Sequence, residues 1–201
     1  MMILRSSPPS PFGRKVKLAA RHLALMDRIR VEMTNTNDGN GTIRRQNPLG
    51  KIPALILENG EVIYDSPVIL EYLDHLAGGG RIIPAGDARW AALRLQALAD
   101  GIMDAAILQI YEKRFRPEEG RSTDWVAYQA DKVARALAAL EAAPPAAGVD
   151  VGTITLACAL GYLDFRFEGA WRAGHPGLAG WFDGFAASVP AFGETAPHDP
   201  K

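Results

Sequence analysis

Strand-forming patterns are confined to the first 77 residues of this chain, and the later apolar repeats have helical spacing. A helical repeat at 11–25 lies between the first two expected strands, and Asn59-Gly60 is a strong hairpin signal between the last two. The order strand, helix, strand, hairpin, helix predicts a mixed sheet with helices packed on it. The expected strands are residues 3–5, 29–33, 53–57 and 62–64.

A glycine-rich stretch divides the chain into two expected parts. Ala77-Gly78-Gly79-Gly80 ends the mixed pattern, and Pro84-Ala85-Gly86-Asp87 precedes a purely helical one. We therefore expect an N-terminal α/β domain at 1–77, a linker at 78–86 and an all-helical domain at 87–201. The expected later helices are 87–115, 123–143, 150–167 (with a reciprocal cap between Asp150 and Thr153) and 178–187, followed by an irregular tail after Pro190.

Composition narrows the function classes. The chain has 201 residues, 48% of them hydrophobic, with 22 basic and 23 acidic residues and a net charge of −1. This balance argues against strong binding to nucleic acid or to an anionic membrane. We expect no membrane span, because the sequence has no apolar run of about 18 residues. We expect no signal peptide, because Met1–Ser6 reads as a strand. The four histidines show no ligand spacing, so we expect no metal. The single cysteine and the expected lack of a membrane span and a signal peptide suit a cytoplasmic protein.

The run Asn47-Pro48-Leu49-Gly50-Lys51-Ile52-Pro53-Ala54-Leu55 brings a turn into a strand through an X-Pro bond. Gly50 suits a turn with positive φ, and Pro53 has no N–H for a ladder. A cis Ile52–Pro53 bond would leave the Ile52 main chain free to pair with an extended peptide. The alternative is a trans proline at the start of an edge strand.

Asp65-Ser66-Pro67 opens a helical repeat. Ser66 is a good N-cap residue, and Pro67 suits the first helical position. The free N–H groups of a helix start attract a carboxylate, and Asp65 could hold an ammonium, so the pair fits the zwitterionic head of an amino acid. Simple helix capping is the alternative.

These two runs lie in an order and spacing that resembles the glutathione S-transferase family over nearly the whole chain, and in particular its bacterial YibF-like branch. Three further runs carry the resemblance: Ser10-Pro11-Phe12-Gly13-Arg14-Lys15, residues 97–105 and residues 157–166. The resemblance implies a thioredoxin-like N-terminal domain, an all-helical glutathione S-transferase C-terminal domain, and glutathione bound between them.

The same resemblance implies roles for individual residues. The Ile52 main chain would bind the cysteinyl part of glutathione next to a cis Pro53. Asp65 and Ser66 would hold the γ-glutamyl head, and Ser10 would occupy the catalytic position.

Ser10 has a chemical reason to act there. A free thiol has a pKa near about 8.5, and only its thiolate is reactive. The Ser10 hydroxyl and the N–H groups of Phe12 and Gly13 at a helix start would favour the thiolate. A plain N-cap role is the alternative for Ser10, and Ser6 and Ser7 are nearby substitutes, of which Ser7 is the better.

Other candidates are weaker. Lys51, Arg14 and Asn35 could meet the glycyl carboxylate of glutathione, although the two cations are more often surface charges. In a homodimer of this family, Asp100 would approach the ammonium of glutathione from the partner subunit, and a solvated acidic face is the alternative.

The pocket for a second substrate is expected between Ser10 and the first long helix. Its candidate residues are Phe12, Met103, Ile107 and Tyr111, the last three on one helical stripe that could equally be core.

Two absences bear on the reaction. No cysteine lies in the tetrad at 10–13, and the single cysteine, Cys158, lies in an apolar helical run. A thiol-disulfide oxidoreductase is therefore disfavoured, and Cys158 is expected to be buried and inert. The leading hypothesis is a glutathione S-transferase that activates the glutathione thiol for attack on a small electrophile. The alternative is a non-catalytic glutathione-binding or interaction module of the same fold.

Overall fold

The computed structural model describes residues 1–199, so Pro200 and Lys201 of the expected helical domain lie outside the described residues. The N-terminal part contains a four-stranded sheet in the order β2-β1-β3-β4. Strand β1 is parallel to β2 and antiparallel to β3, and β3 is antiparallel to β4. The strands are β1 Met2–Ser6, β2 Ile29–Met33, β3 Ala54–Ile56 and β4 Val62–Ile63.

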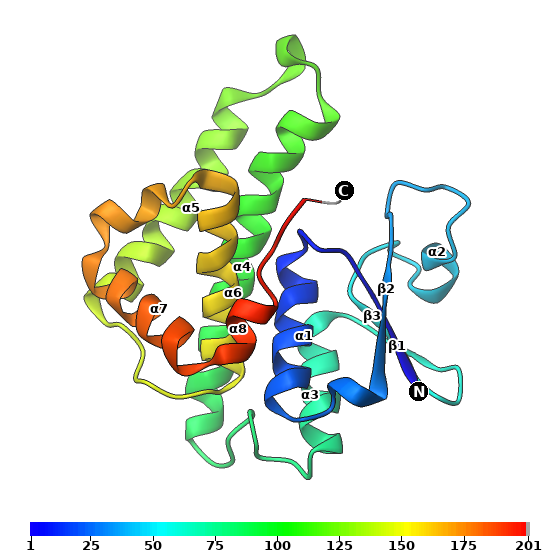
Figure 1. The fold of residues 1–201 in the computed structure, drawn as a ribbon. Coiled ribbons are helices and arrows are strands. Elements are labelled where there is room, and N and C mark those ends of the chain that lie inside the picture. The colour runs from blue at the N-terminus through cyan, green and yellow to red at the C-terminus, as the bar shows by residue number, and fades with distance from the viewer. Residues whose placement is uncertain (200–201) are drawn as a thin grey trace.

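Helices α1 (Pro11–His22) and α3 (Ser66–Leu76) cover the face of this sheet that is turned toward the C-terminal helices, and α2 (Ile43–Gln46) lies on the far side (Figure 1). The alternating residues Met2 and Leu4 of β1 are buried, as a sheet with one covered face requires. Sequence patterns did not predict α2, which is a single turn without a side-chain cap.

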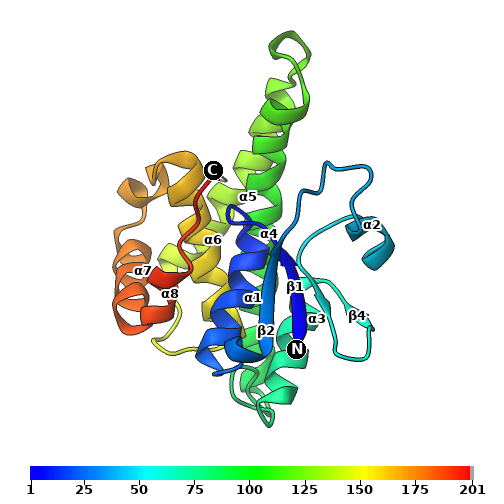
Figure 2. The same ribbon diagram turned by 45° about the vertical axis from the view of Figure 1, so that its right-hand side comes forward.

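All later elements are helical, as the sequence predicted. The later α-helices are α4 Ala88–Phe115, α5 Thr123–Ala142, α6 Val151–Phe167, α7 Pro176–Ser188 and α8 Pro190–Glu194, and the later 3-10 helices are η2 Glu118–Gly120 and η3 Ala170–Gly174. A further 3-10 helix, η1 Met26–Arg28, lies between α1 and β2. The far ends of α4 and α5 extend beyond the rest of the molecule (Figure 2). The predicted fold class, a thioredoxin-like domain followed by a helical domain, is confirmed. The linker boundaries at 78–86 stay a prediction.

Helix α6 is the centre of the packing, because it contacts both α4 and α1 and is buried from Val151 to Leu163. At its start the expected reciprocal cap is present: Thr153 N–H donates to Asp150 Oδ1, and Asp150 N–H donates to Thr153 Oγ1, both at 2.8 Å. Gly152 allows α4 and α6 to approach, because a Cβ there would lie 2.6 Å from the Ala92 carbonyl oxygen.

Two expectations that involve α8 (Pro190–Glu194) were wrong, one about the tail itself and one about Arg14 of α1, which contacts this helix. The tail after Pro190 is not irregular at first, because Pro190 begins the short helix α8, which buries Phe192. Arg14 is not a surface charge. Its buried guanidinium donates to the Phe192 carbonyl oxygen (2.9 Å) and lies 3.8 Å from the centroid of the Phe192 ring, in space left by the missing side chain of Gly161.

The segment between α3 and α4 is anchored by Asp74. This buried carboxylate accepts the backbone N–H groups of Gly80, Arg81 and Ile82 at 2.8, 2.8 and 2.7 Å. The three bonds fix the chain where it leaves the sheet domain. Within residues 1–199, no helix is both long enough and apolar enough to cross a membrane.

Candidate functional site

The loop before β3 is held by Asn47. Its buried side chain accepts the Leu49 N–H and donates to the Lys51 carbonyl oxygen, both at 3.0 Å. Gly50 completes the turn with φ of +63°. The main chain that reaches Ile52 is therefore fixed by a side chain beneath it.

Ile52 presents an open main chain. Among residues 1–199 its N–H and C=O have no hydrogen-bond partner, and the residue is half-buried. The Ile52–Pro53 bond is cis, and Pro53 is buried. An unpaired donor and acceptor in the loop just before β3 can pair with the main chain of an extended peptide ligand.

Lys51 and Asn35 are both exposed. The Asn35 side-chain oxygen accepts the Asn37 N–H at 3.0 Å, so this side chain also shapes its own loop.

At the start of α3 the capping residue is Asp65 and not Ser66, because Asp65 has extended backbone angles and Ser66 is already helical. The Asp65 carboxylate makes no capping hydrogen bond and is exposed. Ser66 is only 2% exposed. The Tyr64–Asp65 bond is cis, which nothing in the sequence indicated. The Asp65 carboxylate is thus free for a ligand.

Ser10 is the N-cap of α1, and its Oγ accepts the Gly13 N–H at 3.1 Å. A hydroxyl that accepts through its oxygen keeps its O–H available to donate. The Gly13 N–H donates to this cap, so of the two N–H groups expected to bind the thiolate only that of Phe12 remains available. Ser6 is 1% exposed and lies under Gly13, so Ser6 is not an alternative contact.

A buried ion pair that sequence analysis missed lies beside these groups. Lys15 of α1 is completely buried, and its Nζ lies 2.6 Å from Asp100 Oδ1 of α4. Burial lowers the pKa of Lys15 and raises the pKa of Asp100, and their mutual attraction opposes both shifts. The signal was present in the sequence, because Lys15 shares a helical face with Ala19, an apolar position.

Asp65, Asp100 and Asp104 form one acidic region. Burial raises the pKa of Asp104, Asp65 raises it further, and Lys51 and Lys15 oppose the shift. Asp65 also acts on Asp100 and Lys15. Three carboxylates against two cations favour the binding of one more positive group, such as an ammonium.

The residues expected to line a second-substrate pocket differ in how exposed they are. Met103 is completely buried in the core, so its assignment to the pocket was wrong; the stripe on α4 turns inward at this point, where α6 packs on it. Ile107 and Phe12 are half-buried, and Tyr111 is 41% exposed and stacks edge-on against Phe115.

A cavity of about 390 Å³ includes Pro9, the residue before Ser10 in the sequence, in its lining. Its lining combines the loop after β1, the outer part of α4, the end of α6 and the C-terminal segment, which Figure 2 shows in red beside the blue loop. The lining residues are Pro9, Ile110, Lys113, Arg114, Arg166 and Asp199.

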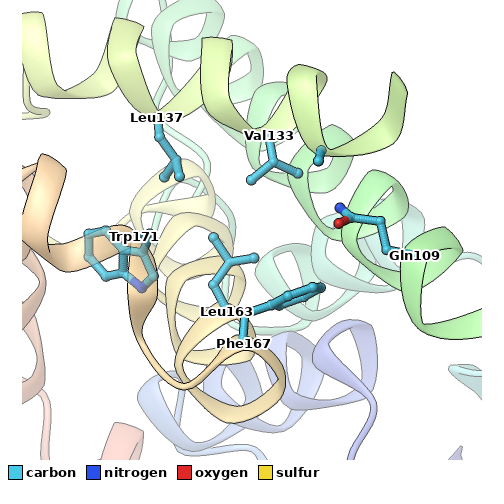
Figure 3. Close-up of a pocket in the computed structure, with 7 residues that line it drawn as sticks. Gln109, Val133, Leu137, Leu163, Phe167 and Trp171 are labelled. Carbon is cyan, nitrogen blue, oxygen red and sulfur yellow. The ribbon is translucent and has the colours of Figure 1, made fainter. Parts of the chain in front are cut away.

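A smaller cavity of about 150 Å³ lies inside the helical domain, away from every candidate residue (Figure 3). Apolar side chains of α5 and α6 point into it from opposite sides, and Gln109 of α4 is turned back to donate to the Ala105 carbonyl oxygen at 3.3 Å. With no charged group in its lining, this cavity offers no catalytic chemistry.

Cys158 is completely buried, and burial raises the pKa of its thiol to about 11, so it remains an unreactive thiol at neutral pH. In the part of the chain that the structure describes, no three His, Cys, Asp or Glu side chains form a group that could hold a metal ion.

The Lys15–Asp100 pair makes a stability prediction. Asp100→Ala leaves a buried cation without a partner, so we expect the free energy of unfolding to fall by about 3 kcal/mol in urea titrations. Asp104→Ala removes an exposed acid from the same helix and should change it by less than about 1 kcal/mol. Combining Lys15→Met with Asp100→Leu should restore most of the loss. Equal effects of the two single variants would contradict the structural role of the pair.

Comparison with known proteins places this geometry in a family. Residues 9–76 match the family model described as the glutathione S-transferase N-terminal domain, and residues 96–184 match the one described as the glutathione S-transferase C-terminal domain. YibF of Escherichia coli (strain K12), described as an uncharacterized GST-like protein, is 37% identical over 174 residues, which are 82% of this chain and 83% of YibF.

Solved structures agree. A glutathione transferase family member from Pseudomonas fluorescens Pf-5 with bound glutathione is 43% identical, with a TM-score of 0.93 over 99% of this chain and 100% of that chain. A structure from the same bacterium with bound S-(propanoic acid)-glutathione is 42% identical, with a TM-score of 0.89 over 98% and 100%. The chain described here belongs to the glutathione S-transferase family.

Proposed function

We propose that this protein is a glutathione transferase, which binds glutathione as co-substrate and adds its sulfur to a small electrophile. The observation that carries the proposal is the unpaired main chain of Ile52 in the same domain as the uncapped Asp65 carboxylate and the free Ser10 hydroxyl. The family member from Pseudomonas fluorescens Pf-5 is solved both with glutathione and with S-(propanoic acid)-glutathione, which supports the same use here.

In this proposal the tripeptide lies along the loop before β3 and the start of α3. Its cysteinyl main chain pairs with Ile52, and its ammonium is held by Asp65, with Ser66 at the helix start near its α-carboxylate. Lys51 and Asn35 are the candidates for the glycyl carboxylate at the other end. The acidic region at Asp65 and Asp104 favours the ammonium over other groups.

Ser10 then acts on the sulfur. Its O–H and the Phe12 N–H donate to the thiolate and stabilise it relative to the thiol, while the proton leaves to solvent. Lowering a thiol pKa by two units takes about 2.7 kcal/mol of differential stabilisation. Two charge-assisted hydrogen bonds are worth about 3 kcal/mol or more together, so these two donors suffice.

The decisive variant is Ser10→Ala. We expect the pKa of the bound glutathione thiol to rise, because a donor to the thiolate is lost, and kcat/KM at neutral pH to fall about tenfold to hundredfold. The ultraviolet absorbance of the thiolate across pH gives the pKa, and a chromogenic aryl chloride gives the rate. Ser10→Thr keeps both the cap and the hydroxyl and should retain most activity.

Ser7→Ala is the matched control for a neighbouring hydroxyl, and it should leave the thiol pKa in place. An unchanged thiol pKa in Ser10→Ala would contradict the catalytic role of Ser10. Glutathione binding without turnover in the native protein would instead support the non-catalytic binding module.

Asp65 makes a prediction for binding alone. Asp65→Asn keeps the shape of the side chain but removes the charge that pairs with the ammonium, so calorimetry should show the dissociation constant of glutathione rise at least tenfold. Glu71→Gln, on the same helix and paired with Arg89 at the surface, should leave it unchanged. Equal affinities of the two variants would place the γ-glutamyl head elsewhere.

We also propose a homodimer that pairs the outer faces of α3 and α4. Val68, Trp90 and Leu98 are 51%, 69% and 37% exposed there, an apolar surface typical of an interface. Asp100 uses only Oδ1 for Lys15, which leaves Oδ2 for the ammonium of glutathione in the partner subunit. Light scattering at micromolar concentration should give twice the chain mass, and Trp90→Glu should halve it. A native monomer would refute this assembly.

A further inference from the structure

We propose that the second substrate is an electrophile that carries a carboxylate, and that the cationic cavity beside Ser10 holds this carboxylate through Arg166. The inference rests on the proposed transferase function. It names the substrate class that the cavity selects, which neither the family nor its shared fold determines.

The charge of the cavity is opposite to that of the chain. The whole protein carries a net charge of −1, yet the cavity is lined by three cations, Lys113, Arg114 and Arg166, and by one carboxylate, Asp199. Cations gathered in a concave wall raise the local concentration of anions and strengthen their binding. The one carboxylate cannot balance three cations, so the cavity keeps an excess of positive charge that a neutral aromatic electrophile would not use.

A carboxylate already occupies the cationic wall. Asp199, from the C-terminal segment, places Oδ1 at 3.0 Å from Arg166 Nη2. The Arg166 side chain is 24% exposed and its guanidinium lies 4.1 Å from the centroid of the Phe165 ring, which fixes its plane. Arg166 Nε is buried and has no partner among residues 1–199, so the guanidinium has donor capacity to spare. Asp199 shows that a carboxylate fits here, and a substrate would displace it.

The surroundings of Arg166 keep its charge available. Burial raises the pKa of the neighbouring Tyr162 to about 12, against the opposing effects of Arg166 and Arg114, so the phenol is neutral at physiological pH. A neutral phenol does not neutralise the guanidinium as a phenolate would. Asp164, two residues before Arg166, is paired with Arg172 at 2.7 Å on the far side and does not compete.

The cavity is placed for the reaction. Pro9 forms part of its wall and is the residue before Ser10, so the cavity borders the loop that carries the proposed sulfur contact. With an aryl chloride, the glutathione thiolate forms a carbon–sulfur bond at the carbon that carries chlorine. The carbon–chlorine bond then breaks, and chloride leaves with its electron pair. No oxidant or metal is required.

The test compares para-chloro-meta-nitrobenzoate with its methyl ester, which have the same reacting carbon and differ in charge. Rates are divided by the uncatalysed rates with glutathione. We expect the native protein to favour the carboxylate, and Arg166→Gln to lower the carboxylate-to-ester ratio of kcat/KM about tenfold, because a charge-assisted hydrogen bond is lost. Lys113→Gln should lower the ratio less, since Lys113 is exposed.

Two further variants separate charge recognition from a structural effect. Asp199→Asn removes the competing carboxylate and should lower the KM for the carboxylate substrate severalfold, the opposite direction from Arg166→Gln. Lys132→Gln, the same change as Lys113→Gln but on α5 away from the cavity, should leave the ratio in place. Equal ratios in the native protein, Arg166→Gln and Asp199→Asn would overturn the inference while leaving the transferase function intact.

A binding measurement decides the case without turnover. Calorimetry compares the glutathione conjugate of the benzoate with that of its methyl ester, and we expect the acid to bind about tenfold more tightly in the native protein and equally in Arg166→Gln. If both conjugates bind alike to the native protein, the carboxylate preference is absent. If neither conjugate nor glutathione binds, the transferase proposal itself fails, and this inference with it.

Discussion

The contact between Lys15 and Asp100 is the interaction on which the arrangement of the site depends. It joins α1, whose first residues lie at the expected sulfur position, to α4, whose outer half lines the cationic cavity proposed for the second substrate. A completely buried ammonium must keep its partner, because an unpaired charge in the interior costs several kcal/mol. The pair therefore fixes the register of the two domains across the site, and it does so with a carboxylate that also belongs to the acidic region around Asp65.

Capping and catalysis are compatible at the start of α1. The sequence predicts that Ser10 acts either as a helix cap or as a contact to the sulfur, with the two roles as alternatives. In the structure the oxygen of Ser10 accepts the Gly13 N–H, and a hydroxyl used in this way keeps its hydrogen for a second partner. The cap also holds the side chain in one position. At Asp65 the opposite holds, because its backbone caps α3 while its carboxylate stays free.

The fold was predictable from sequence because strand and helix periods separate cleanly at residue 77, and because caps such as Asp150 with Thr153 mark their helices. The turn before Ile52 was predictable from its glycine and proline, whereas the cis Ile52–Pro53 bond was implied by the family resemblance, because the residue types also allowed a trans bond. The burial of Met103 and Arg14 was not predictable, because helical spacing identifies one face of a helix but not which element packs on that face. Met103 is completely buried in the core, and the Arg14 guanidinium donates to the carbonyl oxygen of Phe192, which lies 178 residues later in the chain. Such long-range contacts leave no local pattern.

The cationic cavity also arises from residues far apart in the sequence. It shows why the net charge of a chain does not predict the charge of a small substrate. A net charge of −1 speaks against a long anionic partner such as nucleic acid, which needs a broad basic surface. It does not speak against a single carboxylate, which needs only one guanidinium held in place. Here Lys113 and Arg114 come from α4, Arg166 from α6 and Asp199 from the chain end. Only the folded chain brings these four charges to one wall, which also includes Pro9, the residue before the proposed sulfur contact Ser10.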